Sequence, residues 1–264
     1  MKSTAFKKIQ SDGFFILRSG LSKLECENLI KRTKKLKPSG YIPFSKEPMG
    51  FGNLVEDVEF SKILKIKKIK HILDEYFKNK YLINHLMLAN KAPWIGPSAE
   101  WHQEIFNIKT YAPGCSKRDW KKFLQIYIAL ENQNIENGCL KVFKASHKVG
   151  ELPHINIINE FLNHKRSIKL EDLKKLNKKK KLILCIMKPG DVLFFNHLLV
   201  HGSSSNASSK SRKSIVMQAR SRSIIKNNKI FNVETSFRQN FTIDKLKEKI
   251  ETLKKNKIYR SFNT

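Results

Sequence analysis

Short apolar runs separated by turn-forming residues dominate the middle of the chain. From about Tyr81, runs rich in Ile, Val, Leu and Phe alternate with Gly, Pro, Asn and Ser, and each run has the length of a strand. The runs are YLINHLMLANK, FLQIYIALEN, LILCIMK, DVLFFNHLLVHG and SIVMQARSR. Because no regular helices intervene between them, the pattern favours a sandwich or jelly roll over alternating βα units.

Two turns and one insertion interrupt this pattern. The Pro-Gly-Asp triplet at 189–191 predicts a turn in which Gly190 has a positive φ. Asn-Gly at 137–138, between two apolar runs, predicts a hairpin-type turn. Residues 155–181 form a polar insertion that ends in a lysine run, and we expect a short helix at 170–176 on the rim of the β core.

The two ends of the chain predict mainly helices. Residues 13–17 form one short strand, and Ser22 with Glu25 forms a capping-box pattern that starts a helix. A second helix is expected from about Val58 to Phe77. We find no linker, so we expect one domain over residues 1–264. Its parts are a helical portion (1–80), a jelly-roll core (81–222) with the insertion, and a C-terminal helix (240–256).

The charge of the chain allows two interpretations. Lys and Arg number 52 against 23 acidic residues, a formal net charge of +29. Such an excess is typical of nucleic-acid binding. However, lysine is spread over the whole chain and Gly is scarce, which indicates a bias of composition. We therefore expect nucleic acid to be an unlikely partner, while long-range attraction leaves an anionic small-molecule substrate open.

The same composition predicts a cytoplasmic protein. No stretch approaches the roughly 18 apolar residues that cross a bilayer, and the N-terminus lacks the apolar region of a signal peptide. The four cysteines show neither a CxxC pair nor regular spacing, as expected of reduced thiols.

Three residues form a candidate metal site. In an extended segment, His102 and Glu104 point to the same face, so both can bind one ion. About one such triplet is expected by chance in this composition, so this signal alone decides nothing. His201 ends an apolar run immediately before Gly202 and supplies a third ligand. Two imidazoles and a carboxylate with open positions form the facial triad of non-haem Fe(II) oxygenases.

Other polar residues extend or compete with this site. Arg212 precedes the next apolar run, and its planar cation suits bidentate pairing with a carboxylate. His197 shares a strand face with His201 and is an alternative ligand, although the Gly and Ser after His201 favour the latter. For His147 and Asp191 we expect structural roles, in hydrogen bonding and in the turn respectively.

At this point the sequence resembles a known family. Over roughly residues 5–222 the blocks SDGFFILRSGLS, INHLMLANKAP, WHQE, IALENQNIENGCLKVFKASHKVGELPH and KPGDVLFFNHLLVHGSSSNASSKSRKS are similar to the phytanoyl-CoA dioxygenase family. The resemblance implies a mainly β fold with flanking helices and a double-stranded β-helix (jelly roll, cupin-like) core. It also implies Fe(II), 2-oxoglutarate and O2, and hydroxylation of a C–H bond of a small-molecule or acyl substrate with release of succinate and CO2.

Position by position, the resemblance implies a set of site residues. His102, Glu104 and His201 match the metal ligands, and Arg212 matches the residue that binds the distal carboxylate of 2-oxoglutarate. The other expected co-substrate contacts are Ser203, Tyr127, Gln103 and Lys91. One departure matters, because the family usually carries Asp where this chain has Glu104. The extra methylene shifts the carboxylate by ~1.5 Å.

Two alternative functions remain open from the sequence. One is a basic, nucleic-acid-binding jelly roll without metal, and the other is a metal-binding jelly roll that catalyses no reaction. Neither the substrate nor the oligomeric state follows from these residues, because a fold hosts many functions.

Overall fold

The structure is a computed structural model, and it describes residues 2–42, 45–52, 54–105, 108, 115–157 and 166–223. All of these residues belong to one compact unit, which spans residues 1–233. The helix predicted over 240–256 lies outside the described residues, so one domain over the whole chain stays a prediction. None of the described helices is both long and apolar enough to cross a membrane.

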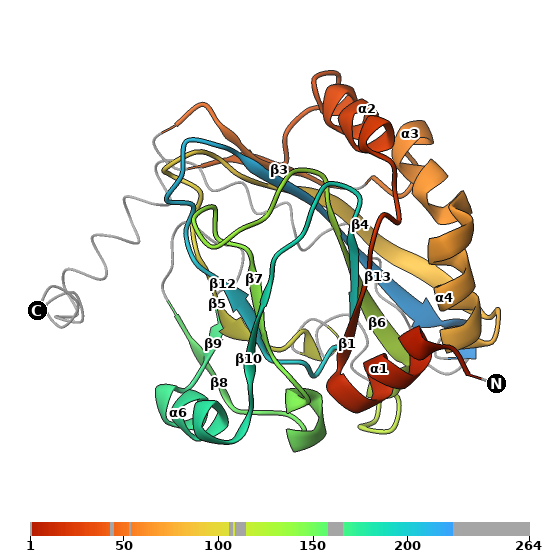
Figure 1. The fold of residues 1–264 in the computed structure, drawn as a ribbon, viewed down its shortest axis with the longest axis vertical. Coiled ribbons are helices and arrows are strands. Elements are labelled where there is room, and N and C mark those ends of the chain that lie inside the picture. The colour runs from red at the N-terminus through yellow and green to blue at the C-terminus, as the bar shows by residue number, and fades with distance from the viewer. Residues whose placement is uncertain are drawn as a thin grey trace, which may run out of the picture. The chain divides into compact units, whose positions relative to one another are not determined.

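Two antiparallel sheets form the core (Figure 1). The larger sheet has the order β1 (Phe14–Leu17), β11 (Val192–Phe195), β6 (Phe123–Ala129), β13 (Arg212–Ser221), β4 (Tyr81–Lys91), β3 (Pro48–Phe51) and β2 (Gly40–Tyr41). The smaller sheet has the order β10 (Leu182–Cys185), β7 (Leu140–Phe143), β12 (His201–Ser203) and β5 (Ala99–His102). The predicted jelly-roll core is confirmed.

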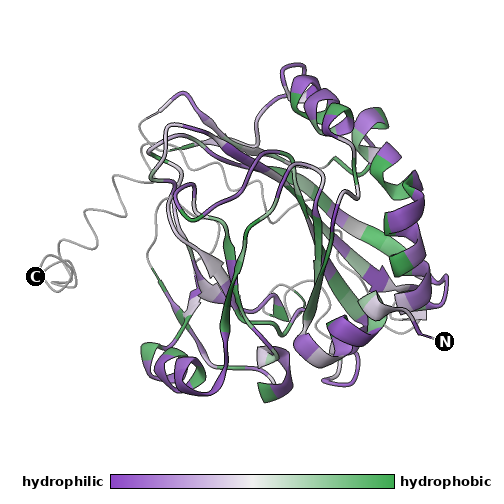
Figure 2. Cartoon of the chain, viewed as in Figure 1, coloured by the Kyte–Doolittle hydropathy of each residue, from purple (hydrophilic) through white to green (hydrophobic). Residues whose placement is uncertain are grey.

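Helices cover the outer face of the larger sheet (Figure 1). They are α1 (Thr4–Asp12), α2 (Lys23–Thr33), α3 (Val58–Ser61), the 3-10 turn η1 (Lys62–Lys65) and α4 (Lys67–Phe77). Along β13, Ile215, Met217 and Ala219 join the core beneath these helices. Because side chains of a strand alternate between its faces, the residues between them point into the barrel. In Figure 2, hydrophobic and hydrophilic positions alternate along these helices, as expected for helices with one buried face.

The helix predictions for the first 80 residues are largely confirmed. Ser22 and Glu25 form the capping box at the start of α2. The helix expected over 58–77 is instead three elements, because Ile66 adopts an extended conformation (φ −67°, ψ 114°) between η1 and α4. Strands β2 and β3 were not predicted, since their Gly, Pro and Met residues lack the β-branched pattern of a strand.

The expected hairpin at residues 137–138 is wrong. Gly138 has the positive φ of 72° that the pattern predicts, but the turn leads from β6 in the larger sheet to β7 in the smaller one. Both edges of β6 are already paired, with β11 and β13, so no edge is left for β7. By contrast, Gly190 has the expected positive φ, 88°.

The insertion lies against the smaller sheet. It contains α6 (Leu170–Lys179), as expected, and a two-stranded sheet of β8 (His154–Asn156) and β9 (Arg166–Ile168). Leu176 of α6 packs with Ile168, Phe143 and Val200, so the helix covers an apolar part of the outer face. The 3-10 turns η2 (Trp120–Lys122) and η3 (Ser146–Val149) complete the described elements.

Candidate metal centre

Strand pairing brings the two histidines together. His102 is the last residue of β5, His201 is the first residue of β12, and the two are direct cross-strand partners. Their ring centroids lie 4.2 Å apart. Glu104 follows just beyond the end of β5, and its backbone N–H donates to the carbonyl of His197 at 2.9 Å. All three side chains are buried.

The three side chains converge on one point. Glu104 Oε1 lies 3.6 Å from Nε2 of His102 and 3.4 Å from Nε2 of His201. One ligand atom from each residue falls within 4.8 Å of the other two, and no other cluster of three or more such ligands occurs among the described residues. The predicted triad is therefore assembled, and its nitrogen and oxygen ligands match those of a non-haem Fe(II) site.

Backbone carbonyls fix the orientation of both imidazole rings. Nδ1 of His102 lies 2.6 Å from the carbonyl of Glu100, and Nδ1 of His201 lies 2.9 Å from that of Leu199. A carbonyl only accepts hydrogen bonds, so Nδ1 carries the proton in each ring. The lone pair of each Nε2 is then directed toward Glu104, as ligation of a metal requires. The residues present fit the iron that the sequence predicts.

The charges of the triad also suit a cation. Burial favours the neutral acid, but when His102 and His201 are protonated their hydrogen bonds and charges outweigh it and hold the pKa of Glu104 well below its usual value. Burial, together with the charge of His201, lowers the pKa of His102. An ionised carboxylate and a neutral imidazole are the protonation states that bind metal.

A second cluster of polar residues joins the two sheets near the triad. Ser203 lies two residues beyond His201, and its hydroxyl accepts a hydrogen bond of 2.8 Å from Nζ of Lys91. Lys91 on β4 is the cross-strand partner of Arg212 on β13. Arg212 donates to the carbonyl of Gly138. Both cations are buried, so burial first, and then the charge of Arg212, lowers the pKa of Lys91 to about 6.

The remaining predicted contacts lie at different distances from this cluster. The Arg212 guanidinium carbon is 5.9 Å from the ring centroid of Tyr127, whose hydroxyl donates to Gln133 at 3.0 Å. Gln103 lies in the turn between the ligands, but its side chain bonds to the backbone of Gly150, Leu152 and Leu198. Gln103 thus holds neighbouring segments together, and its contact with the co-substrate stays a prediction.

His147 and Asp191 make the structural contacts expected of them, and His197 lies outside the ligand cluster. His147 Nε2 is 3.1 Å from the carbonyl of Gln10, and Asp191 pairs with Arg18 at 2.6 Å. His197 is buried beside the triad but is not one of the three clustered ligands.

Sequence reasoning missed two supporting residues. His154 accepts a hydrogen bond of 3.1 Å from the backbone of Gln103, which couples the insertion to the ligand segment. The side chain of Asn206 donates to the carbonyls of Lys91, Ala92 and Lys210 and fixes the loop before β13. Asn206 stands in a run of serines, where nothing in the sequence distinguishes it.

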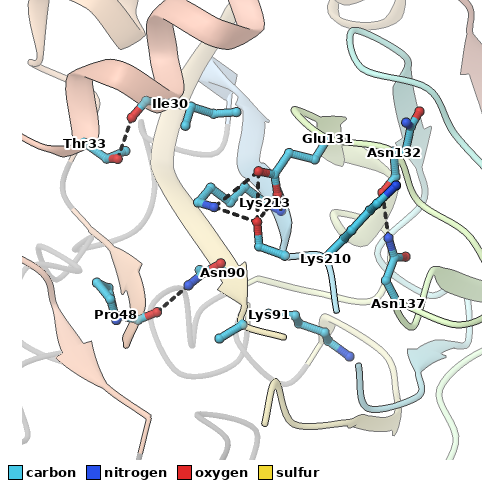
Figure 3. A network of polar contacts seen from close by, with 12 residues as sticks. Ile30, Thr33, Pro48, Asn90, Lys91, Glu131, Asn132, Asn137, Lys210 and Lys213 are labelled. Carbon is cyan, nitrogen blue, oxygen red and sulfur yellow. Dashed lines mark hydrogen bonds and ion pairs between the residues drawn. The ribbon is translucent and has the colours of Figure 1, made fainter. Parts of the chain in front are cut away.

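Figure 3 shows the polar contacts of Asn90 and Lys213, which are sequence neighbours of Lys91 and Arg212. Asn90 donates to the carbonyl of Pro48 at 2.7 Å, and Lys213 pairs with Glu131 at 3.2 Å. Asn90 and Lys213 are therefore bonded to other groups and not to the two buried cations.

Comparison with known proteins places this arrangement in a family. The family model described as "Phytanoyl-CoA dioxygenase (PhyH)" matches residues 9–214, which include the triad and Arg212. The chain belongs to the phytanoyl-CoA dioxygenase family. Among curated members, the peroxisomal phytanoyl-CoA dioxygenase of Bos taurus is 24% identical over 229 residues, covering 79% of this chain and 65% of the relative. The human protein is 26% identical over 186 residues, covering 70% of this chain and 53% of the relative. This member of the family thus spans between half and two thirds of their length.

Solved structures share the fold at low sequence identity. EctD from S. alaskensis with 2-oxoglutarate and 5-hydroxyectoine has a TM-score of 0.69 and 18% identity, covering 89% of this chain and 81% of that one. EvdO2 from Micromonospora carbonacea var. aurantiaca, complexed with 2-oxoglutarate, has a TM-score of 0.60 and 18% identity, covering 84% and 91%.

Proposed function

We propose that this protein is an Fe(II)- and 2-oxoglutarate-dependent dioxygenase that hydroxylates a C–H bond of a small-molecule or acyl substrate. The observation that carries the proposal is the convergence of His102, Glu104 and His201 beside a buried pair of cations, Lys91 and Arg212. Membership of the phytanoyl-CoA dioxygenase family supports it. The balanced reaction converts substrate, 2-oxoglutarate and O2 to hydroxylated product, succinate and CO2.

The spacing of the two clusters suits a five-carbon dicarboxylate. Ser203 is two residues from His201 along β12, a separation of roughly 7 Å. The four carbon–carbon bonds of 2-oxoglutarate, at ~1.5 Å each, reach about 5 Å. In the proposed mode one end lies at the metal and the far carboxylate meets Arg212 and Lys91. Ser203 positions the Lys91 ammonium through their hydrogen bond.

The protein residues carry distinct tasks in this proposal. His102, Glu104 and His201 hold the metal, which when bound supplies the activation of O2. Arg212 orients the co-substrate by a charge-assisted pair, and Tyr127 packs beside it. Substrate and co-substrate bound in this interior would displace water from the reacting atoms, which strengthens each of these interactions. The four cysteines are free thiols, which fits a reducing compartment and supports a cytoplasmic location.

The test is an anaerobic titration of metal-free protein with Fe(II) and 2-oxoglutarate, followed by visible absorption. A charge-transfer band that needs both additions supports chelation of 2-oxoglutarate by protein-bound iron. His201→Ala should abolish the band, and Arg212→Ala should raise the 2-oxoglutarate concentration needed at least tenfold. Lys213→Ala is the matched control, because Lys213 adjoins Arg212 but pairs with Glu131 instead. A folded protein that binds no iron would overturn the proposal and favour a nucleic-acid-binding jelly roll. Iron and 2-oxoglutarate binding without succinate formation would favour a non-catalytic one.

A further inference from the structure

Three polar side chains form a row across the middle of the larger sheet. They are His85 on β4, Gln218 on β13 and Gln125 on β6. Gln218 is the direct cross-strand partner of both others, so the three side chains are neighbours on one face. The outer face belongs to Leu86, Met217 and Ile126, which pack beneath the helices. By alternation, the polar row points into the barrel.

The row shares this interior with the metal centre. Burial lowers the pKa of His85, and the negative charge of Glu104 partly opposes that shift, so His85 lies within electrostatic reach of the triad. His85, Met87 and Val216 on the inner face are partly exposed, whereas their outer-face neighbours Leu86 and Ile215 are fully buried. Solvent therefore reaches the inner face of the sheet on the side where the triad lies.

The side chain of Gln125 is buried, and its amide oxygen lacks a hydrogen-bond donor in the described part of the chain. Its side chain is 3% exposed, and among the described residues no group hydrogen-bonds to Oε1. A second buried glutamine, Gln133, uses its Oε1 to accept from the hydroxyl of Tyr127 at 3.0 Å, although no described group accepts from its Nε2. A buried acceptor without a partner costs free energy, which a methionine or leucine of similar size would avoid. Such a residue is expected where a ligand completes the hydrogen bond.

We propose that the row of His85, Gln218 and Gln125 binds a hydrogen-bonding group of the substrate that is oxidised. The inference rests on the proposed function and names its substrate class. Because Oε1 of Gln125 needs a donor, the substrate carries an N–H or O–H group, as in an amine, a carboxamide or an alcohol, close to the carbon that reacts. A bare alkyl chain over the row would shut water out and leave Oε1 of Gln125 unpaired, so the site discriminates against it.

A matched pair of variants separates a ligand-binding role from a structural one. Gln125→Met and Gln133→Met both replace a buried glutamine by an apolar residue of similar size. Melting temperatures are measured on the ligand-free protein. Gln133→Met should melt lower because Tyr127 loses its acceptor, while Gln125→Met should melt at the wild-type temperature or above it. If Gln125→Met melts as low as Gln133→Met, the amide serves the fold and the inference is wrong.

A second experiment addresses the substrate class. The iron-loaded enzyme is supplied with 2-oxoglutarate, ¹⁸O2 and a metabolite extract divided into an aqueous and a chloroform phase. One oxygen atom of O2 enters succinate and the other enters the product. The inference expects ¹⁸O in an aqueous compound with an N–H or O–H group, at a rate that falls tenfold or more in Gln125→Met. Labelled acyl chains in the chloroform phase, formed equally by wild type and variant, would overturn it.

These outcomes are distinguishable from failure of the proposed function. If the wild type shows no absorption band with iron and 2-oxoglutarate, the proposed dioxygenase function is wrong. The melting temperatures of Gln125→Met and Gln133→Met still test whether the Gln125 amide serves the fold. A normal band together with a destabilised Gln125→Met overturns the row alone.

Discussion

Lys91 and Arg212 are adjacent buried cations, at 6% and 4% exposure, with no acidic side chain bonded to either among the described residues. Burial and mutual repulsion make the charged form of Lys91 unfavourable, hence its pKa of about 6. An anion placed between them would reverse both effects. In the proposed binding mode, the pair would therefore couple co-substrate binding to the protonation of one amine.

That coupling predicts proton uptake. At pH 8 the ligand-free Lys91 is mostly neutral, because the pH lies above its pKa of about 6. A bound dianion raises the pKa back toward its ordinary value, so binding 2-oxoglutarate at pH 8 should take up close to one proton. Below pH 5 the amine is already charged and the uptake should vanish. Calorimetry of iron-loaded, anaerobic protein in buffers of different ionisation enthalpy measures it. Lys91→Met should remove the uptake; a wild type without uptake at pH 8 would refute this account.

At the residue scale, sequence spacing predicted that His102, Glu104 and His201 cluster, because the signals for all three are local. His102 and Glu104 are two residues apart, and His201 is marked by the Gly that follows it. The bond from Lys91 to Ser203 joins residues 112 positions apart, and no local pattern indicates it. The polar row of His85, Gln218 and Gln125 likewise depends on the register of three strands. Such registers are set by packing across the whole core.

At the scale of elements, the connection from β6 to β7 holds Arg212, the residue proposed to bind the distal carboxylate of 2-oxoglutarate. The segment crosses between the two sheets at Gly138, whose carbonyl accepts from Arg212. The Asn-Gly signal correctly predicted the backbone conformation, but not which strands the turn connects. Strand order depends on which edges are free, and β6 has none.

Alanine substitutions at two glycines separate a steric clash at the β6–β7 connection from the cost of backbone strain alone. Gly138 and Gly150 both have positive φ, 72° and 88°. A Cβ at Gly138 would lie 2.2 Å from the carbonyl oxygen of Ser204, whereas one at Gly150 would meet nothing within 4 Å. Gly150, at φ 88° and ψ −159°, lies in a region that essentially only glycine adopts, so Gly150→Ala should cost about 1–3 kcal/mol of unfolding free energy. Gly138→Ala should cost more and also weaken 2-oxoglutarate binding, because the acceptor of Arg212 must move. Denaturant titrations and the absorption band measure the two effects; equal costs would mean that the crossing tolerates displacement.

At the scale of the whole molecule, the net charge of +29 opposes folding. Like charges held on a compact surface repel one another more than on an expanded chain. The described ion pairs, such as Arg32 with Asp57 at 2.9 Å, each join one cation to one acidic group and leave this excess unchanged. The interpretation of the charge as a compositional bias rests on the spread of lysine along the chain, and it stays a prediction.

Salt should therefore stabilise the protein. Raising NaCl from 20 to 200 mM shortens the screening length to about 7 Å and weakens the repulsion. The melting temperature should rise by a few degrees, and equally in choline chloride, which screens without specific cation binding. A melting temperature that falls with salt would show that attractive pairs dominate this surface.

Because β5 lies at the edge of the smaller sheet, a bound metal would also stabilise the pairing of this strand. Within that sheet β5 pairs only with β12, and their register shifts between His201 and Ser203. Since His102 and His201 come one from each strand, an ion bound by both would tie this edge strand to its neighbour. Removing the ion should let β5 open locally while the larger sheet stays closed. Amide hydrogen exchange should then accelerate first at residues 99–102. Iron starvation would expose this edge of the chain to proteases well before the protein as a whole unfolds.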